Sequence, residues 1–276
     1  MPRPLPVLPR AVFHSHTFRC GHAEGTVDDL CRAALDAAIP VLGVSDHAPF
    51  PDNRFRDSRM DFSEIEDYCR DVRAAQGAYA GRLRVLLGFE VDYFPSIGPA
   101  FYEDLFFGRL RADYLLAAVH FLEGASRDLA LWGKGIDFGP DQVRPYIDAQ
   151  VKALETGLFS CLAHPDMFAS RCPASSPAIE AVVRPLFAAA AALGVPVELN
   201  AYGLRKPPLA LPDGSTRPLY PWRPFWDLAA TIPGLRVLAG PDAHRPQDLW
   251  SNMPEAFAWA AQSGIVPENA PLPPSP

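Results

Sequence analysis

Seven short apolar runs, each followed by an interruption, constrain the fold of this 276-residue chain more than any other feature. Their apolar character is continuous rather than alternating, which is typical of strands buried on both faces of a parallel sheet. We therefore predict seven parallel strands. The runs cover residues 11–14, 41–45, 84–91, 114–119, 158–163, 195–200 and 235–240.

Helical patterns separate the runs, and two of them begin with a candidate capping box. Thr26 has Asp29 three residues later, and Ser63 has Glu66 three residues later. Such pairs satisfy the free N–H groups of a first helical turn. Strands and helices alternate about seven times without a break in composition, which predicts one α/β domain, a β/α barrel, over residues 1–265. Further helices are expected near residues 99–110, 141–156, 178–193, 224–231 and 246–262.

Two proline-rich stretches are predicted to lie outside the regular elements. Residues 266–276 have the composition of a disordered tail. Residues 201–223 form the longest irregular stretch and follow a predicted strand directly. A loop of that length in a compact domain is usually a functional lid or an insertion. Arg205 and Lys206 at its start favour a lid.

All seven histidines lie at or soon after the end of an apolar run, and two acidic residues mark two further run ends. In a β/α barrel the loops after the strands meet at one mouth. Imidazole nitrogen and carboxylate oxygen suit zinc, iron and manganese, and so many groups exceed what one ion can use. We therefore predict two or three ions. The nine groups are His14, His16, His22, His47, Glu90, His120, His164, Asp242 and His244.

The spacing of these residues also disfavours a simpler interpretation. A lone histidine is more often a core residue with a backbone partner than a ligand. His14 and His16, however, are two residues apart, and a period of two places both imidazoles on the same side of a strand. Asp242 and His244 repeat this spacing after the last run.

Charge and composition restrict the partners of the chain. A formal net charge of −7 disfavours docking on nucleic acid or an anionic membrane, whereas a small anionic substrate remains compatible. No stretch approaches the roughly 18 apolar residues of a membrane span, and the first residues lack the apolar segment of an export signal. The five cysteines contain no C-x-x-C pair. We expect reduced thiols and a cytoplasmic location, and the sequence does not indicate an oligomeric state.

The ordered motifs resemble those of the polymerase-and-histidinol-phosphatase (PHP) superfamily. The resemblance runs from about residue 12 to residue 250, and three of the contexts, CGHAEG, SDHAP and AYGLRKP, resemble its monofunctional histidinol-phosphatase branch. It implies a distorted (β/α)7 barrel with a trinuclear metal site at the carboxyl ends of the strands. The motifs are HSH, CGHAEG, SDHAP, GFEVDY, AVHFL, AHPDMF, ELNAYGLRKP and PDAHRP.

The resemblance also implies how the ligands divide among three ions. The first ion would take His14, His16, Glu90 and Asp242. The second would take Glu90 with His120 and His164, and the third His22, His47 and His244. Glu90 would bridge two ions, which its two carboxylate oxygens allow.

The implied activity is hydrolysis of a phosphomonoester, in the first place L-histidinol phosphate in histidine biosynthesis. A metal-bridging hydroxide would attack phosphorus in line. Asp242 is the candidate for orienting or deprotonating this nucleophile, and His244 is a candidate proton donor for the leaving alkoxide. Arg205 and Arg171 are candidate phosphate ligands because a guanidinium fork matches phosphate oxygens. Lys206 is a weaker candidate, and Asn200 would support either the substrate or a neighbouring side chain.

Three other functions remain open from the sequence. A PHP phosphoesterase could act on another small ester such as a nucleotide or sugar phosphate, because ligand sets are shared among such enzymes. A module that binds metal without turnover would need no phosphate ligand, and Arg205 counts against it. Hydrolysis of a C–N bond would normally use a two-metal or lysine-bridged site, and no lysine lies at a run end.

Overall fold

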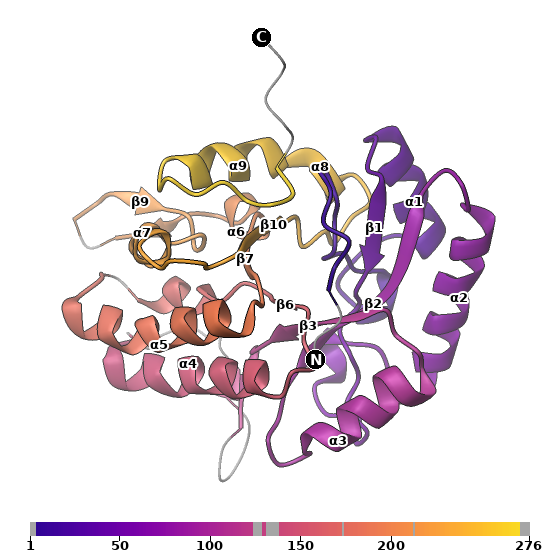
Figure 1. Cartoon of the computed structure of the whole chain (residues 1–276), viewed down its shortest axis with the longest axis horizontal. Coiled ribbons are helices and arrows are strands. Elements are labelled where there is room, and N and C mark those ends of the chain that lie inside the picture. Colours follow the sequence, from indigo (N-terminus) through magenta and orange to yellow (C-terminus); the bar gives the residue numbers. More distant parts are fainter. Residues whose placement is uncertain (1–3, 124–128, 131–137, 173, 212, 271–276) are drawn as a thin grey trace.

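Six parallel strands form the central sheet of the protein, in the order β1-β2-β3-β6-β7-β10 (Figure 1). The computed structural model describes residues 4–123, 129–130, 138–172, 174–211 and 213–270. Each strand lies within or overlaps one of the predicted apolar runs, so the prediction of an α/β fold with a parallel sheet is confirmed. The strands are β1 (Val41–Val44), β2 (Arg84–Asp92), β3 (Tyr114–Ala118), β6 (Cys161–Leu162), β7 (Val197–Asn200) and β10 (Val237–Gly240).

The first predicted strand is an irregular segment that lies between the two edges of this sheet. Val12 forms a parallel bridge with Leu42 of β1, and Ser15 forms one with Ala243, just after β10. The prediction of a seventh regular strand is therefore wrong in detail. The segment passes from one neighbour to the other and makes a single bridge with each, which gives a distorted barrel of six strands and one extended segment.

Helices cover the outside of the sheet (Figure 1). Two predicted helices are each divided in two. One division lies between α3 (Pro99–Tyr102) and the π-helix η4 (Glu103–Arg109). The other lies between α8 (Asp248–Ser251) and α9 (Met253–Ala261), where Pro254 stands in the first turn of α9 and cannot donate a backbone hydrogen bond. The remaining helices on the outside are α1 (Val27–Asp36), α2 (Ile65–Ala78), α4 (Pro140–Glu155), α5 (Pro177–Leu193) and α7 (Arg223–Ala230).

One of the two predicted capping boxes is present. Thr26 and Asp29 cap α1 reciprocally, as expected. The box predicted for Ser63 and Glu66 is wrong. Asp61 and Glu64, also three residues apart, form a capping box instead, and it caps the 3-10 turn η3 (Phe62–Glu64) that precedes α2. The chain therefore enters this helix one short turn earlier than the sequence pattern suggested.

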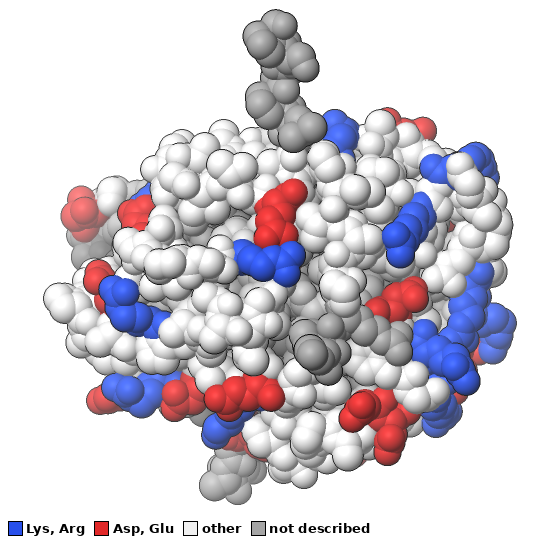
Figure 2. All heavy atoms as spheres, viewed as in Figure 1, with Lys and Arg blue, Asp and Glu red and all other residues white. Residues whose placement is uncertain are grey.

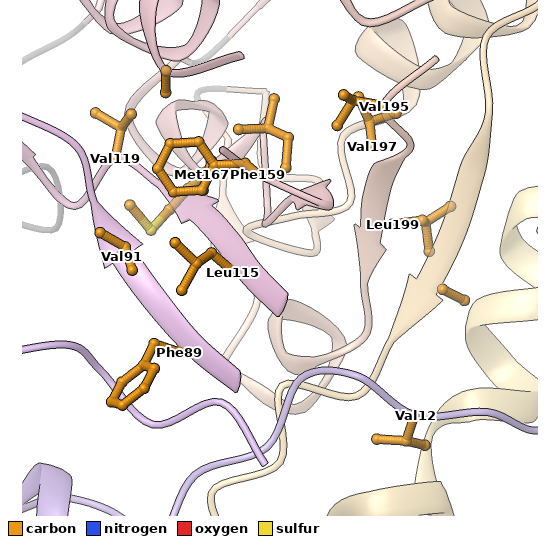
Figure 3. Packing of buried hydrophobic residues seen from close by; sticks show 14 of the residues in the cluster. Val12, Phe89, Val91, Leu115, Val119, Phe159, Met167, Val195, Val197 and Leu199 are labelled. Atoms are coloured by element: carbon orange, nitrogen blue, oxygen red, sulfur yellow. The ribbon is translucent and has the colours of Figure 1, made fainter. Parts of the chain in front are cut away.

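The strands bury different side chains on their two faces. The outer face packs against the helices in the main hydrophobic cluster, and Figure 3 shows Val91, Leu115 and Val197 among its members. The inner face carries a separate cluster that includes Leu86 and Leu116. Burial on both faces explains why the strands are continuous in apolar character rather than alternating.

Tyr114 fills the interior of the barrel near the amino ends of the strands. Its hydroxyl donates to the carbonyl oxygen of Phe13 at 2.6 Å. Gly43 and Gly88 leave room for the ring, because a Cβ atom at either position would lie 2.2 Å or 2.3 Å from Tyr114. Apolar packing closes this half of the barrel, so the polar residues further along the same inner face collect at the carboxyl ends.

The prediction of a disordered tail over residues 266–276 is wrong for residues 266–270. Asn269 is fully buried, and its carboxamide accepts from Ala239 N at 2.9 Å and donates to the carbonyl oxygens of Ala239 and Ala11 at 2.7 and 2.9 Å. Glu268 forms an ion pair with Arg236. The end of the domain thus pairs with the backbone of β10 and the first segment, and residues 271–276 lie outside the described part of the chain.

The predicted lid over residues 201–223 contains regular structure of its own. It holds the short helix α6 (Tyr202–Arg205) and the hairpin of β8 (Leu209–Ala210) and β9 (Thr216–Arg217). Arg217 donates to the carbonyl oxygens of Ala169 and Cys172, which ties the hairpin to the turn after β6. Elsewhere, β4 (Phe121–Leu122) pairs antiparallel with β5 (Leu129–Ala130). Movement of the 201–223 segment as a lid stays a prediction.

Charged side chains of both signs lie on the surface of the protein, whose sequence has a modest negative net charge. On the face shown in Figure 2, basic and acidic side chains are interspersed, and no continuous basic stripe crosses that face. Within the described residues, none of the helices combines the length and apolar character required to span a membrane. All five cysteines are buried and free, as expected for reduced thiols.

Asn269→Ala should lower the free energy of unfolding by about 1–3 kcal/mol, because its buried backbone partners would lose their hydrogen bonds. Urea denaturation measures this change. Lys152→Ala on the exposed side of α4 is the control, expected to stay within about 0.5 kcal/mol of the parent. Equal stability of the Asn269 variant and the parent would show that residues 266–270 do not support the barrel.

Candidate metal centre

Glu90, on β2, lies at the centre of the histidines that the sequence analysis selected. It is 1% exposed. Its Oε1 lies 2.7 Å from His164 Nε2, and its Oε2 lies 2.8 Å from His47 Nδ1. The other imidazole nitrogens around it are His14 Nε2 at 3.4 Å, His120 Nε2 at 3.5 Å and His16 Nε2 at 3.7 Å. One carboxylate therefore faces five imidazoles from four different segments of the chain.

Asp242 supplies the second acidic group and follows β10. Its Oδ1 lies 3.1 Å from His16 Nε2, 3.2 Å from His244 Nδ1 and 3.6 Å from His14 Nε2. His14 and His16 thus face the same two carboxylates, Glu90 and Asp242, as their spacing of two predicted.

His22 and His244 form the outer part of the site. Their Nε2 atoms are 3.0 Å apart, and the His22 ring lies 5.3 Å from that of His47. His22 is the exposed member, whereas the other eight side chains are buried. It therefore lies at the mouth of the barrel.

The structure brings all nine predicted residues together. Among the described residues, ligand atoms within 4.8 Å of one another form five groups: His14–His16–Glu90, His22–His47–His244, His47–Glu90–His120, His14–His164–Asp242 and His16–Cys20–His244. The set His22, His47 and His244 matches the group that the resemblance implies for a third ion. His120 and His164 fall into different groups although both face Glu90. The division of the ligands among ions stays a prediction.

The residues of the site fit metal ions because their buried atoms lack other partners. Among the described residues, these atoms have no hydrogen-bond partner outside the nine candidate ligands: His14 Nε2, His16 Nδ1, His16 Nε2, His47 Nδ1, Glu90 Oε2, His164 Nδ1 and Asp242 Oδ1. Buried polar atoms in native proteins nearly always have a partner, and each exception requires an explanation. Nitrogen and carboxylate donors that converge in this way are the set that zinc, iron and manganese use.

Electrostatics keeps both acids of the site ionised. Burial opposes ionisation of Glu90, but the surrounding imidazoles of His47, His14 and His120 outweigh it and hold its pKa well below the usual value. Burial likewise opposes ionisation of Asp242, and His14 and His244 lower its pKa well below the usual value. The site therefore presents two carboxylates at neutral pH.

The imidazoles respond in two directions. Burial lowers the pKa of His16, but Asp242 and Asp46 outweigh burial and raise it to about 9. Burial and the neighbouring His244 and His16 lower the pKa of His22 to about 4. In the metal-free protein at neutral pH, His16 is therefore protonated and His22 is neutral.

Buried carboxylates behind the ligands were missed by the sequence analysis. Asp92 accepts from His120 N at 2.6 Å and lies 3.1 Å from His120 Nδ1, and its other partner is the buried guanidinium of Arg59 at 3.0 Å. Glu198 lies 2.9 Å from His14 Nδ1. Both could have been found from the period of two, because Asp92 follows Glu90 and Glu198 precedes Asn200 on the same strand faces. Asp46 accepts from Thr17 N at 3.1 Å and so orients a loop.

The predicted substrate residues have different environments. Arg205 Nη2 donates to the carbonyl oxygens of Pro241 and Asp242 at 2.8 and 3.0 Å. Lys206 Nζ lies 4.0 Å from the centre of the Tyr202 ring, which stacks on His244 at 4.7 Å. Arg205 and Lys206 therefore lie beside Asp242 and His244.

Asn200 and Arg171 differ from these two cations. Asn200 Nδ2 donates to Asp242 Oδ2 at 3.1 Å, and its Oδ1 accepts from Tyr202 N at 2.8 Å. Its carboxamide is thus occupied by protein partners, which matches the predicted alternative of supporting a neighbour. The Arg171 guanidinium packs 4.9 Å from the Phe138 ring centre.

Comparisons with known proteins agree with the fold. A family model described as the PHP domain matches residues 13–201. The "Probable histidinol-phosphatase" of Deinococcus radiodurans is 31% identical over 253 residues, which covers 86% of this chain and 86% of that protein. A fission yeast relative of the same name, from Schizosaccharomyces pombe, is 20% identical and covers 92% of this chain and 86% of that protein.

Two crystal structures share the fold. One, from Listeria monocytogenes, has a TM-score of 0.72 at 21% identity and covers 89% of this chain and 99% of its own. The other is a histidinol phosphate phosphatase from Lactococcus lactis in complex with zinc, L-histidinol and phosphate. It has a TM-score of 0.69 at 14% identity, and the match covers 94% of this chain and 95% of that one.

Metal binding at pH 7 should release protons, because His16 is protonated in the metal-free protein and must be neutral to ligate an ion. The apparent affinity should rise with pH up to about 9, the pKa of His16. Over the same range, from about 6.5 upward, the metal-free protein should lose the stability that the protonated imidazole contributes. Calorimetry of zinc binding in buffers of different ionisation enthalpy measures the proton count, and binding without proton release at pH 7 would contradict this assignment.

Proposed function

The chain belongs to the PHP domain family, and from this premise we propose that it is a metal-dependent phosphomonoester hydrolase that acts on L-histidinol phosphate. The observation that carries the proposal is the convergence of nine metal-ligating side chains, with their buried unpaired atoms, around Glu90. The relatives named as histidinol phosphatases and the Lactococcus complex with L-histidinol and phosphate support this substrate.

The proposed cofactor is two or three ions of zinc, iron or manganese. His14, His16, Glu90 and Asp242 would hold one, His120 and His164 with Glu90 a second, and His22, His47 and His244 a third. When bound, such ions supply a hydroxide nucleophile at neutral pH and neutralise oxygens of the phosphoryl group. The zinc in the Lactococcus structure supports this class of metal.

Asp242 is suited to accept hydrogen bonds at the reacting face. Its pKa is held well below the usual value, despite its burial, by His14 and His244, so it is ionised. Asn200 Nδ2 donates to Asp242 Oδ2 at 3.1 Å, so Asp242 Oδ1 is the oxygen that faces the imidazoles. The proposed role of Asp242 is to orient or deprotonate the nucleophilic water.

If the centre holds two ions and His244 is not a ligand, His244 is the proposed proton donor for the leaving alkoxide. Its Nδ1 lies 3.1 Å from the carbonyl oxygen of Asp242, and Tyr202 stacks on its ring. These two contacts fix the plane of the imidazole. A fixed ring delivers a proton to one position, which general acid catalysis requires.

Arg205 is the proposed phosphate ligand. It lies beside Asp242. Its Nη1 is buried without a hydrogen-bond partner among the described residues, and its Nε lies 3.7 Å from Asp248 Oδ2. A guanidinium with free donors on a rigid fork matches the oxygens of a phosphate. Lys206 would add positive charge at the same edge, and Arg171 is a further candidate from the turn after β6.

Other small phosphate esters form the alternative substrate class, because a site that holds a phosphoryl group does not by itself select the alcohol. Phosphate release by metal-replete protein should be measured with L-histidinol phosphate beside nucleotide and sugar phosphates. A clear preference for another ester would replace the proposed substrate, and turnover of none would favour a non-catalytic metal-binding module. The cytoplasmic location stays a prediction.

Glu90→Ala and Asp242→Ala should each lower kcat by at least about 10³-fold, because each removes a carboxylate that positions the nucleophile. Steady-state phosphate release measures the loss. Asp148→Ala on the exposed side of α4 is the control. Chelation should abolish activity and added divalent metal should restore it. Turnover by a verified metal-free protein would contradict the proposal.

Arg205→Ala should lower kcat/KM by roughly 10- to 150-fold, the equivalent of about 1.5–3 kcal/mol for a hydrogen bond to a charged group. Arg205→Lys should recover only part of this loss, because lysine keeps the charge without the planar fork. Arg245→Ala, whose side chain is 56% exposed, is the matched control cation. Parent-like rates for Arg205→Ala on every ester tested would show that this arginine only supports the carbonyl groups after β10.

A further inference from the structure

We propose that Glu198 is the positioning residue that aligns three separate strand ends of the metal centre, an inference that rests on the proposed function. Glu198 lies on β7 and is 4% exposed. It is not one of the nine candidate ligands. Its carboxylate instead contacts His14, the backbone of His164 and, through Asn200, Asp242.

The contact with His14 orients an imidazole of the centre. His14 Nδ1 lies 2.9 Å from Glu198 Oε1 and 3.0 Å from Oε2. With the Nδ1 proton directed to Glu198, Nε2 is the nitrogen that faces Glu90 and Asp242. A carboxylate behind a ligand histidine fixes its tautomer and ring plane in this way.

The contacts with His164 and Asn200 hold two further strand ends in unusual backbone conformations. His164 N donates to Glu198 Oε2 at 3.1 Å, and the φ of His164 is 29°. Asn200 Nδ2 donates to Glu198 Oε2 at 2.9 Å and to Asp242 Oδ2 at 3.1 Å, and the φ of Asp242 is 45°. Positive φ is uncommon for residues other than glycine and persists where neighbours hold it.

Every partner of the Glu198 carboxylate is a donor. His14 Nδ1, His164 N and Asn200 Nδ2 all direct a hydrogen at it. A glutamine at this position would oppose one of these N–H groups with its own NH2. No lysine or arginine among the described residues forms an ion pair with Glu198. Its ion-pair partner is His14 of the centre.

Gly240 on the neighbouring strand makes this placement possible. A Cβ atom at position 240 would lie 1.7 Å from Glu198 Oε1 and 2.5 Å from Cδ, and each of the three nearest atoms belongs to Glu198. An alanine there would force the carboxylate to move. Gly240→Ala therefore displaces the carboxylate without changing its chemistry.

The experiment measures metal affinity by competition with a chromogenic chelator, using zinc and the full-length protein. Glu198→Gln, Glu198→Ala and Gly240→Ala should each weaken binding by about 10- to 100-fold, the range for a partner behind a metal ligand. Asp113→Asn is the matched control, because this carboxylate accepts from Leu87 N and Gln76 at the opposite end of the strands. Its zinc affinity should equal that of the parent.

A double-mutant cycle tests whether Gly240 acts through Glu198. In the Glu198→Ala background, Gly240→Ala should cost no further affinity, because the carboxylate that it displaces is gone. Visible spectra of cobalt-substituted protein should change in the single variants and stay parent-like in Asp113→Asn. At saturating metal, kcat should return toward the parent value, because Glu198 acts through the ligands rather than on the substrate.

Two results would separate this inference from the proposed function. If Glu198→Gln binds zinc as the parent does while the parent hydrolyses L-histidinol phosphate, Glu198 is only a space-filling residue and the inference is wrong. If the variants lose affinity while the metal-replete parent hydrolyses no phosphomonoester, the positioning role stands and the proposed function is wrong. Additive losses in the double variant would also contradict the coupling.

Discussion

The buried carboxylate of Glu90 is the constraint on which the rest of the barrel depends. An ionised carboxyl group that is 1% exposed requires positive or hydrogen-donating partners, since an unpaired charge in the interior is costly. Its five imidazole partners come from four segments, so the ends of these segments must meet at one point. The irregular first segment, which lies in space between β10 and β1, supplies two of these partners, because it carries both His14 and His16. Closing the barrel and assembling the site are therefore one structural event.

Along the inner face of the strands, the residues that pack the core and the candidate metal ligands lie at opposite ends. Near the amino ends it is aliphatic and aromatic, with Leu86, Leu116 and the Tyr114 ring packed together. Near the carboxyl ends the same face presents Glu90 and His120. A strand of this kind is apolar on its outer face throughout and changes only on its inner face. Mutations in the lower half should therefore affect folding, whereas those in the upper half affect ligation.

Behind the candidate ligands stands a second set of carboxylates that face donors rather than the centre. Asp46 accepts from Thr17, Asp92 holds His120, and Glu198 holds His14. Each is buried, and each ties a ligand or its loop to a strand or turn distant in sequence. Rigid support of this kind keeps a site within the narrow geometry that catalysis requires. The same support explains why the centre can retain ordered imidazoles around two ionised acids.

The sequence alone determined the parallel α/β sheet, the nine candidate ligands and the family, because ligand positions follow strand ends and strands are marked by local apolar runs. Only the tertiary structure decided the irregular closure by the first segment, the burial of Asn269 and the placement of Glu198. These depend on partners far apart in the chain, 258 residues for Asn269 with Ala11 and 184 for Glu198 with His14. A local pattern carries strand and helix periods, but it cannot specify which distant donor a buried acceptor will meet.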